Sequence, residues 1–273
     1  MIYRYFAPNI RKVLEKIDLD DIEEIRLRAE KPIVLEKGYG KEMLSYFPSQ
    51  REVTETLEIM SENSIYAFLE EIKNGFLTLN GGHRVGICGR SIIKHGQITN
   101  ITQVSGLNIR IAKEIKGIAE GVVNINSFTE NCLIISPPNC GKTTLLRDIA
   151  RVLGGVRKVG IIDERGEIVG MHKGVASYDV GVNSDCLDLC PKALGIIMMV
   201  RAMSPEVIIV DEIGSKEDIE AIKLAINSGV RVVATAHGWG RENVEERIPH
   251  LGDIFGKIIT IKRENGQFLY EIK

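Results

Sequence analysis

"LIISPPNCGKTTLLRDIA", residues 133 to 150, decides the fold of the second half of the chain. A short apolar run ends in Ser-Pro-Pro, and Gly-Lys-Thr-Thr then opens a stretch with helical spacing. A strand, a glycine-containing turn and a helix that begins with Lys and Thr are the components of a phosphate-binding loop, or P-loop. Such a turn points backbone N–H groups at phosphate oxygens, and the helix N-terminus adds positive potential. The stretch therefore predicts a nucleotide site.

The residue types of this loop fit separate tasks. Lys142 is expected to reach the β- and γ-phosphates, and Thr143 to give its hydroxyl to Mg²⁺. Gly141 lets the backbone approach the phosphates because it has no Cβ. The usual first glycine of the motif is Ser136 here, followed by two prolines that stiffen the loop. The residues predicted to contact the nucleotide are Ser136, Pro137, Pro138, Asn139, Cys140, Gly141, Lys142, Thr143 and Thr144.

A second motif, "EVIIVDEIG", places Asp211 and Glu212 directly after four apolar residues. In a P-loop enzyme this is the Walker B position, where a carboxylate holds Mg²⁺ and an adjacent Glu polarises the attacking water. We therefore predict Thr143, Asp211 and Glu212 as the metal-binding residues. The alternative is an acidic helix N-cap, since "SKEDIEAIKLAI" follows. A cap does not require two acids directly after a buried strand.

Two more apolar runs end in functional side chains. "VGIIDERGEIVG" carries Asp163, Glu164 and Glu167. Two acidic strand ends side by side would concentrate negative charge that a divalent cation makes tolerable; the alternative is a surface turn with ion pairs to Arg165. "VVATAHG" carries His237 after a Thr, where a polar side chain would sense the γ-phosphate or orient water. For this His the alternative is a hydrogen-bonded core residue.

The apolar runs of the second half are short, dense in Ile and Val, and do not alternate with polar residues. Such strands are buried on both faces, which predicts a parallel sheet covered by helices. They are Cys132–Ile135, Val159–Ile162, Val207–Val210 and Val230–Ala234. The C-terminal stretch from Asp253 is typical of a hairpin around Asn265 and Gly266.

The first half reads as mixed α and β. Strands are expected around residues 25–27 and 33–35 with a turn at Pro32, and two amphipathic helices between residues 49 and 75. Residues 76–114 favour hairpins, and a linker is expected within residues 118–130. The predicted fold class is α/β, with an N-terminal α+β domain in residues 1–125 and a RecA-like P-loop ATPase domain in residues 126–273.

Composition excludes several classes of protein. The chain has 273 residues with 44% hydrophobic and 26% charged side chains, which is ordinary globular usage. Its net charge of −2, with no basic stripe among aromatics, argues against a nucleic-acid motor. Five scattered cysteines and the absence of a signal-peptide pattern favour a cytoplasmic protein. No apolar run approaches the roughly 20 residues needed to span a bilayer.

Together these motifs resemble the secretion ATPase superfamily, the motors of type II and type IV secretion and of pili. That family carries a Walker A motif, an acidic Asp box, a Walker B motif and a His box, which match SPPNCGKTT, IIDERGE, VIIVDEIG and TAHG in the same order. The whole chain further resembles one branch, the stage III sporulation protein AA family of endospore-forming bacteria. Its hallmarks here include EIRLR, GGHRVGICGR, LNIRIAKE and ATAHG.

The resemblance implies a function as well as a fold. It implies a cytoplasmic homohexamer that binds ATP and Mg²⁺ between its two domains, hydrolyses ATP, and drives integral membrane subunits of a sporulation secretion channel. It implies Glu167 as general base, with Glu212 assisting. It also implies that arginines of the N-terminal domain, matching Arg84, Arg90 and Arg110, neutralise transition-state charge. The alternative for each of these is a solvated strand arginine.

This sequence departs from the superfamily in its Asp box. Pilus motors have Glu-Asp-Pro, a hydrophobic residue and Glu, whereas this chain has Asp-Glu-Arg-Gly-Glu. The division of labour between Glu164 and Glu167 therefore stays open. A nucleotide-binding ring scaffold with little hydrolysis is the alternative function, and the intact Lys142, Thr143, Glu167 and Glu212 argue against it.

Overall fold

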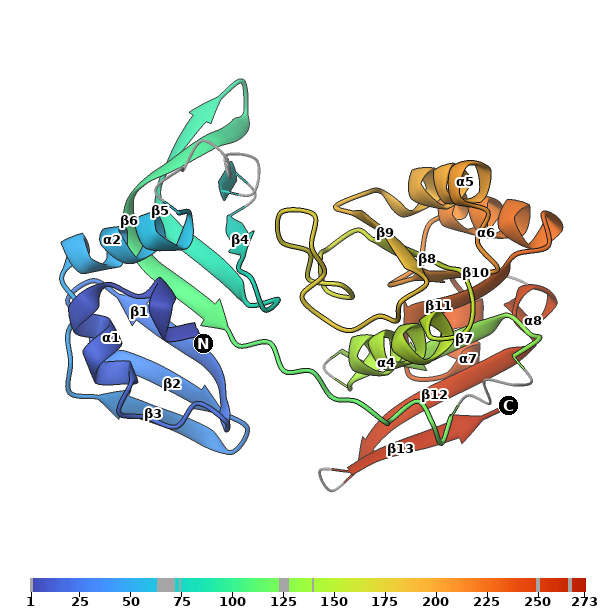
Figure 1. Cartoon of the computed structure of the whole chain (residues 1–273), viewed down its shortest axis with the longest axis horizontal. Coiled ribbons are helices and arrows are strands. Elements are labelled where there is room, and N and C mark those ends of the chain that lie inside the picture. The colour runs from blue at the N-terminus through green and yellow to red at the C-terminus, as the bar shows by residue number, and fades with distance from the viewer. Residues whose placement is uncertain are drawn as a thin grey trace. The chain divides into compact units, whose positions relative to one another are not determined.

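The computed structural model describes residues 2–62, 72–73, 75–122, 128–138, 140–248, 251–264 and 267–273. The chain divides into two compact units, Met1–Lys113 and Glu114–Lys273, and each has its own sheet (Figure 1). Among the described residues, no helix is both long and apolar enough to cross a bilayer.

The first unit is an antiparallel sheet with helices packed on it. The strand order is β3-β2-β1-β6-β5-β4. The hydrophobic core joins apolar side chains of α1 and α2 to those of β1 and β2, among them Ile10, Leu57 and Ile25. Its elements are η1 (Ile2–Tyr5), α1 (Pro8–Leu14), β1 (Ile22–Arg28), β2 (Ile33–Lys37), β3 (Gly40–Leu44), α2 (Gln50–Met60), β4 (Phe76–Thr78), β5 (Arg84–Lys94) and β6 (Gln97–Arg110).

Local sequence explains where α2 begins. The Ser49 side chain accepts a hydrogen bond from the Glu52 backbone N–H, and the Glu52 carboxylate accepts one from the Ser49 N–H, which forms a capping box. The predicted strands around Pro32 are β1 and β2, and the predicted hairpins are β4 to β6. Of the two helices expected between residues 49 and 75, the first is α2; the second falls mostly outside the described residues.

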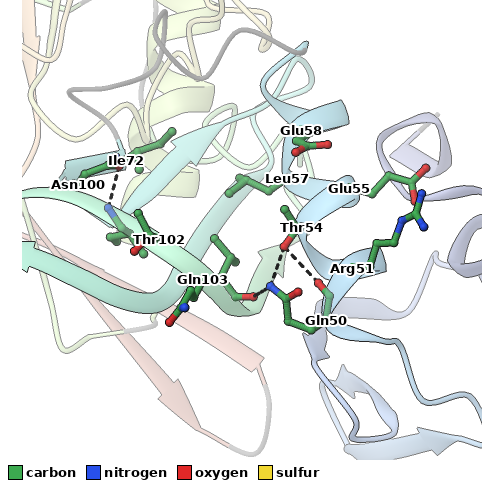
Figure 2. A pocket seen from close by; sticks show the side chains of 12 residues that line it. Gln50, Arg51, Thr54, Glu55, Leu57, Glu58, Ile72, Asn100, Thr102 and Gln103 are labelled. Atoms are coloured by element: carbon green, nitrogen blue, oxygen red, sulfur yellow. Dashed lines mark hydrogen bonds between the residues drawn. The ribbon is translucent and has the colours of Figure 1, made fainter.

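A cavity of about 650 Å³ lies within the first unit, between α2 and β6 (Figure 2). Gln50 Nε2 donates to Thr54 Oγ1 at 3.0 Å and to the Val104 carbonyl at 3.4 Å, which ties the helix to the strand. The site residues chosen from the sequence do not line it. Its walls are formed by Gln50, Arg51, Thr54, Glu55, Leu57, Glu58, Ile72, Asn100, Ile101, Thr102, Gln103 and Val104.

The second unit is a mostly parallel sheet with the order β13-β12-β7-β11-β10-β8-β9, in which β13 runs antiparallel to β12. Helix α4 covers one face, and α5 and α6 cover the other (Figure 1). Its elements are β7 (Cys132–Ser136), α4 (Lys142–Gly154), β8 (Val159–Asp163), β9 (Ser184–Asp188), α5 (Lys192–Met203), β10 (Val207–Val210), α6 (Lys216–Asn227), β11 (Arg231–His237), α7 (Arg241–Glu245), α8 (Leu251–Ile254), β12 (Lys257–Glu264) and β13 (Gln267–Ile272).

Burial on both faces accounts for the continuous apolar runs. In β7, Ile134 faces the core under α4, whereas Leu133 and Ile135 face the core under α5 and α6. The four predicted strands of this half are β7, β8, β10 and β11, and they pair in parallel as expected. The C-terminal hairpin is β12 and β13, and β12 is also a parallel neighbour of β7.

The division between the units differs from the predicted boundary. The Ala119 N–H donates to Asp148 Oδ2 of α4 at 2.7 Å, and Lys116 Nζ contacts Asp179 Oδ2 at 2.9 Å. Residues 114–122 therefore pack with the second unit. The predicted boundary at residue 125 lies further along the chain than the division at Lys113.

Candidate active site

The carboxyl ends of four parallel strands meet at one edge of the second unit's sheet. His237 is paired with Ser136, and Val210 is paired with both Ala234 and Ile162. The side chains that follow β7, β8, β10 and β11 are therefore neighbours, although they come from distant parts of the sequence. This edge is where open α/β sheets bind their ligands.

The P-loop follows β7 and ends at α4. Ser136 is the last residue of β7, fully buried, and its hydroxyl donates to the Pro137 carbonyl at 2.9 Å. Gly141 is the N-cap of α4 and has a φ of 77°, a conformation that other residues rarely adopt. A Cβ at Gly141 would also meet the Phe268 ring at 3.3 Å. Cys140 is half-buried and Pro138 is exposed, whereas Asn139 is outside the described residues.

Lys142 opens α4 and is 5% exposed. Its Nζ lies 3.4 Å from Glu212 Oε1, and 3.1 and 3.3 Å from the two ring nitrogens of His237. A buried ammonium without an anionic partner would be strongly destabilising, so Glu212 compensates its charge. The structure thus brings together three residues that the sequence predicted from three separate motifs.

Thr143, Asp211 and Thr235 form a second cluster beside Lys142. Thr143 Oγ1 donates to Asp211 Oδ2 at 3.0 Å, and the Thr235 hydroxyl donates to Asp211 Oδ1. Thr235 Oγ1 in turn accepts the Glu212 backbone N–H at 2.8 Å. Thr235 therefore fixes both acidic residues of the Walker B strand end. Thr144, next along α4, is half-buried.

Glu212 is at the centre of the site. Its backbone has a φ of 51°, which is strained for a residue other than glycine. Its Oε1 lies 2.6 Å from His237 Nε2, and its Oε2 is paired with Arg165. Burial alone would raise the pKa of Glu212, but the charges of Lys142, His237 and Arg165 outweigh burial and lower it. Glu212 is therefore held ionised.

The Asp box is a loop organised by Asp163 at the end of β8. Asp163 is 1% exposed, and its carboxylate accepts the backbone N–H groups of Glu167, Ile168 and Val169 at 2.9, 2.9 and 2.8 Å. Burial raises its pKa against the effect of these hydrogen bonds. Backbone donors satisfy the Asp163 carboxylate, and the nearby charge of Asp211 also raises its pKa, so the need for a cation at these strand ends stays a prediction.

The two other Asp-box carboxylates differ in their surroundings. Glu164 forms an ion pair with Lys192, the first residue of α5. The main chain at Glu167 is held on both sides: its N–H donates to Asp163, and its carbonyl accepts from Arg147 Nη2 at 2.6 Å. Its side chain is half-buried.

Sequence reasoning missed Arg147 as a site residue and considered Arg165 only as part of a surface turn. Arg147 of α4 donates to the carbonyls of Glu167 and Ile168 and lies over the Tyr178 ring at 3.6 Å, so it ties the Asp box to the P-loop helix. Arg165 reaches back to Glu212. The departure of DERGE from the usual Asp box was the available signal for Arg165, whereas no motif marked Arg147.

Of the three predicted arginines of the first unit, two are neighbours and the third lies apart from them. Arg84 and Arg110 are directly paired across β5 and β6. Arg84 lies over the Phe76 ring at 4.0 Å, and Arg110 Nε lies 3.6 Å from Glu24 Oε2. Like charges directly opposite each other are destabilising, and the Glu24 carboxylate offsets the charge of Arg110. Arg90 lies beyond a break in the register, in the exposed part of β5.

Asp188, at the end of β9, gives a testable pH effect. It is paired in register with Asp163, and its Oδ1 is buried without a hydrogen-bond partner. Burial, and then the charge of Asp163, raise its pKa to about 6. In the unfolded chain the pKa of Asp188 has its ordinary value of 3.8. The folded state therefore loses stability as the pH rises from about 4 to about 6.

We expect Asp188→Asn to raise the free energy of unfolding at pH 8 by about 1 kcal/mol, because a full shift would give about 3 kcal/mol and the half-exposed side chain is screened by water. Urea unfolding followed by circular dichroism at pH 5 and pH 8 measures this, and the gain is expected to shrink at pH 5. Asp185→Asn, at an exposed position of the same strand, is the control. An equal gain at both pH values would contradict the prediction.

Comparison with known proteins places this geometry in a family. The model of the family described as "Sporulation stage III, protein AA" matches residues 1–265. The Stage III sporulation protein AA of Bacillus subtilis (strain 168) is 43% identical over 236 residues, which cover 83% of this chain and 76% of that protein. Protein SEEDLING PLASTID DEVELOPMENT 1 of Arabidopsis thaliana is 30% identical over 235 residues, 81% of this chain and 32% of its own length.

Solved structures show the same fold at low sequence identity. The Legionella pneumophila ATPase DotB is similar with a TM-score of 0.65 at 16% identity, over 98% of this chain and 80% of that chain. The pilus retraction motor PilT, crystallised with bound ADP, is similar with a TM-score of 0.67 at 16% identity, over 97% and 82%. The predicted fold class, a RecA-like ATPase domain preceded by an α+β domain, is confirmed. With the family match over nearly the whole chain, this protein belongs to the sporulation stage III, protein AA family.

Proposed function

We propose that this protein is a Mg²⁺-dependent ATPase that converts ATP and water to ADP and phosphate and performs mechanical work on a membrane-embedded secretion channel during endospore formation. The observation that carries the proposal is the meeting of Lys142, Thr143, Asp211 and Glu212 at one end of the sheet. The fold shared with DotB, an ATPase, and with PilT, which binds ADP, supports it.

The donor set beside the P-loop fits Mg²⁺. Thr143 Oγ1 and Asp211 Oδ2 lie 3.0 Å apart, and both are the oxygen ligands that this ion prefers. When bound, Mg²⁺ would neutralise charge on the β- and γ-phosphates. Thr143 and Asp211 would hold it. Glu212, which the sequence also suggested as a ligand, is engaged by Lys142, His237 and Arg165 and is better placed to orient water.

Hydrolysis requires a base for the attacking water. We assign this role to Glu167, because Glu164 is neutralised by Lys192, whereas the Glu167 main chain is fixed by Asp163 and Arg147. Lys142 would move from Glu212 to the phosphates as nucleotide enters. His237, at 2.6 Å from Glu212, would then keep that carboxylate in place near the γ-phosphate.

In the proposed reaction, the negative charge that develops in the transition state requires positive charge in addition to that of Lys142 and Mg²⁺. The paired Arg84 and Arg110 would supply positive charge, with Arg90 in a lesser role. We propose that nucleotide is enclosed between the two units and that six copies form a ring. Domain closure on ATP would transmit work to integral membrane subunits, with the protein cytoplasmic and peripheral at the membrane.

The first experiment is steady-state phosphate release with Mg²⁺ and ATP over a range of protein concentrations. We expect turnover that needs Mg²⁺ and increases per molecule with concentration, as for an oligomeric motor. Tight ATP binding without turnover, even after addition of a membrane partner, would sink the ATPase proposal and favour a nucleotide-binding ring scaffold.

A further inference from the structure

The contact between Arg165 and Glu212 is not explained by charge balance in the nucleotide-free site. Lys142 already neutralises Glu212, and the Arg165 side chain is 55% exposed, so an arginine brought there from a loop would ordinarily contribute little stability. The pair nevertheless joins the Asp box to the Walker B strand end. The pair thereby connects the loop of Glu167, the proposed base, with Glu212, the carboxylate proposed to orient water.

We propose that Arg165 is a positioning residue that couples the placement of Glu167 to occupancy of the phosphate site, acting through the Glu212 carboxylate. The proposal rests on the function proposed above, in which Lys142 and Glu167 serve hydrolysis. It assigns Arg165 a task distinct from that of the first unit's arginines, since Arg165 belongs to the same unit as the P-loop.

The two oxygens of the Glu212 carboxylate have different partners. Its Oε1 faces Lys142 at 3.4 Å and His237 at 2.6 Å, whereas its Oε2 faces Arg165. A phosphate that enters the loop competes with Oε1 for the Lys142 ammonium and leaves the Oε2 contact untouched. Arg165 therefore becomes a main counter-charge of Glu212 once nucleotide is bound.

The loop that carries Arg165 is held by several hydrogen bonds. Asp163 holds the N–H groups of residues 167–169, and Arg147 holds the carbonyls of Glu167 and Ile168 at 2.6 and 2.9 Å. Between Arg165 and Glu167 lies Gly166, with a φ of 66° that makes a tight turn. In so short and closed a loop, a displacement of Arg165 is passed to Glu167.

The test compares Arg165→Ala and Arg165→Lys with Arg241→Ala. Arg241 is a matched control, because its side chain is also about half exposed, at 49%, and also forms an ion pair with a glutamate, Glu245. For Arg165→Ala we expect kcat to fall about 10- to 100-fold, because a base misplaced by about 1 Å loses that much. KM and the Kd for fluorescently labelled ADP are expected to stay within about threefold.

The split between kcat and KM, together with rescue by a conservative variant, separates positioning from a merely structural role. Arg165→Lys should restore part of kcat, because one ammonium keeps the charge but does not hold a carboxylate as a planar guanidinium does. Arg241→Ala should change neither kcat nor KM.

A second measurement follows the Glu167 carboxylate directly by carbon-13 NMR of the full chain, with Glu167→Gln for assignment. Addition of Mg²⁺ and ADP should shift this signal in the wild type and leave it nearly unchanged in Arg165→Ala. Normal kcat and a normal signal shift in Arg165→Ala would overturn the inference while the ATPase function stands. A wild type that binds ADP without hydrolysing ATP would defeat the ATPase function, and the NMR shift would still decide the coupling. A wild type that does not bind ADP overturns both.

Discussion

Lys142→Ala is expected to lower ATP turnover by at least about 100-fold and to weaken nucleotide binding, because the loss of one preorganised charge at developing negative charge costs that much. The ammonium is held at the start of α4, almost out of contact with water, where its interaction with phosphate would be little screened. Phosphate release at saturating Mg²⁺ and ATP, and titration with labelled ADP, measure the two effects.

The control is Lys223→Ala, which removes the same charge from an exposed position of α6. Its turnover is expected to match the wild type within about twofold, since surface substitutions of this kind change little. Circular dichroism checks that both variants fold. Wild-type turnover in a folded Lys142→Ala protein would show that this loop does not hold the reacting phosphates.

Glu167→Gln is expected to bind ATP and ADP as the wild type does and to lose about 100- to 10,000-fold in kcat, the contribution of a general base. The substitution keeps the shape of the side chain and leaves the hydrogen bonds of its main chain to Asp163 and Arg147 in place. Single-turnover hydrolysis, started from a preformed ATP complex, measures the chemical step apart from binding.

The matched control for the base is Glu164→Gln, two positions before Gly166 in the same loop. Glu164 is paired with Lys192, so its neutral variant is expected to retain turnover within about fivefold. The reverse pattern, with loss in Glu164→Gln and activity in Glu167→Gln, would assign the base to Glu164 and would leave Glu167 with a structural task.

Much of the second unit could be predicted because its strands are buried on both faces. Burial turns β7, β8, β10 and β11 into continuous apolar runs that stand out in the sequence. Strand β9 was missed because it lies at the edge of the sheet and reads "SDCLD", with only one clearly apolar residue. Edge strands are half-solvated, so their sequences resemble loops.

The candidate site was predictable where motif and chemistry coincide, as for the P-loop lysine and the Walker B acids. The contacts that organise the site were not, because they depend on how separate strand ends meet in space. Arg165, after β8, reaches Glu212 at the end of the neighbouring strand β10, and Thr235 fixes the Glu212 backbone from β11. Periodicity along one segment carries no information about such pairs.

The strand order also bears on how the protein is made. β7 lies between β11 and β12, so both of its neighbours are synthesised long after it, whereas the pairings of the first unit are complete by Arg110. Domains fold as units from the N-terminus, and pairing of distant segments is slow. A nascent chain thus carries a folded first unit while its P-loop strand still has no partner. The edge of the sheet proposed to bind nucleotide is therefore completed only after β11 and β12 have been synthesised.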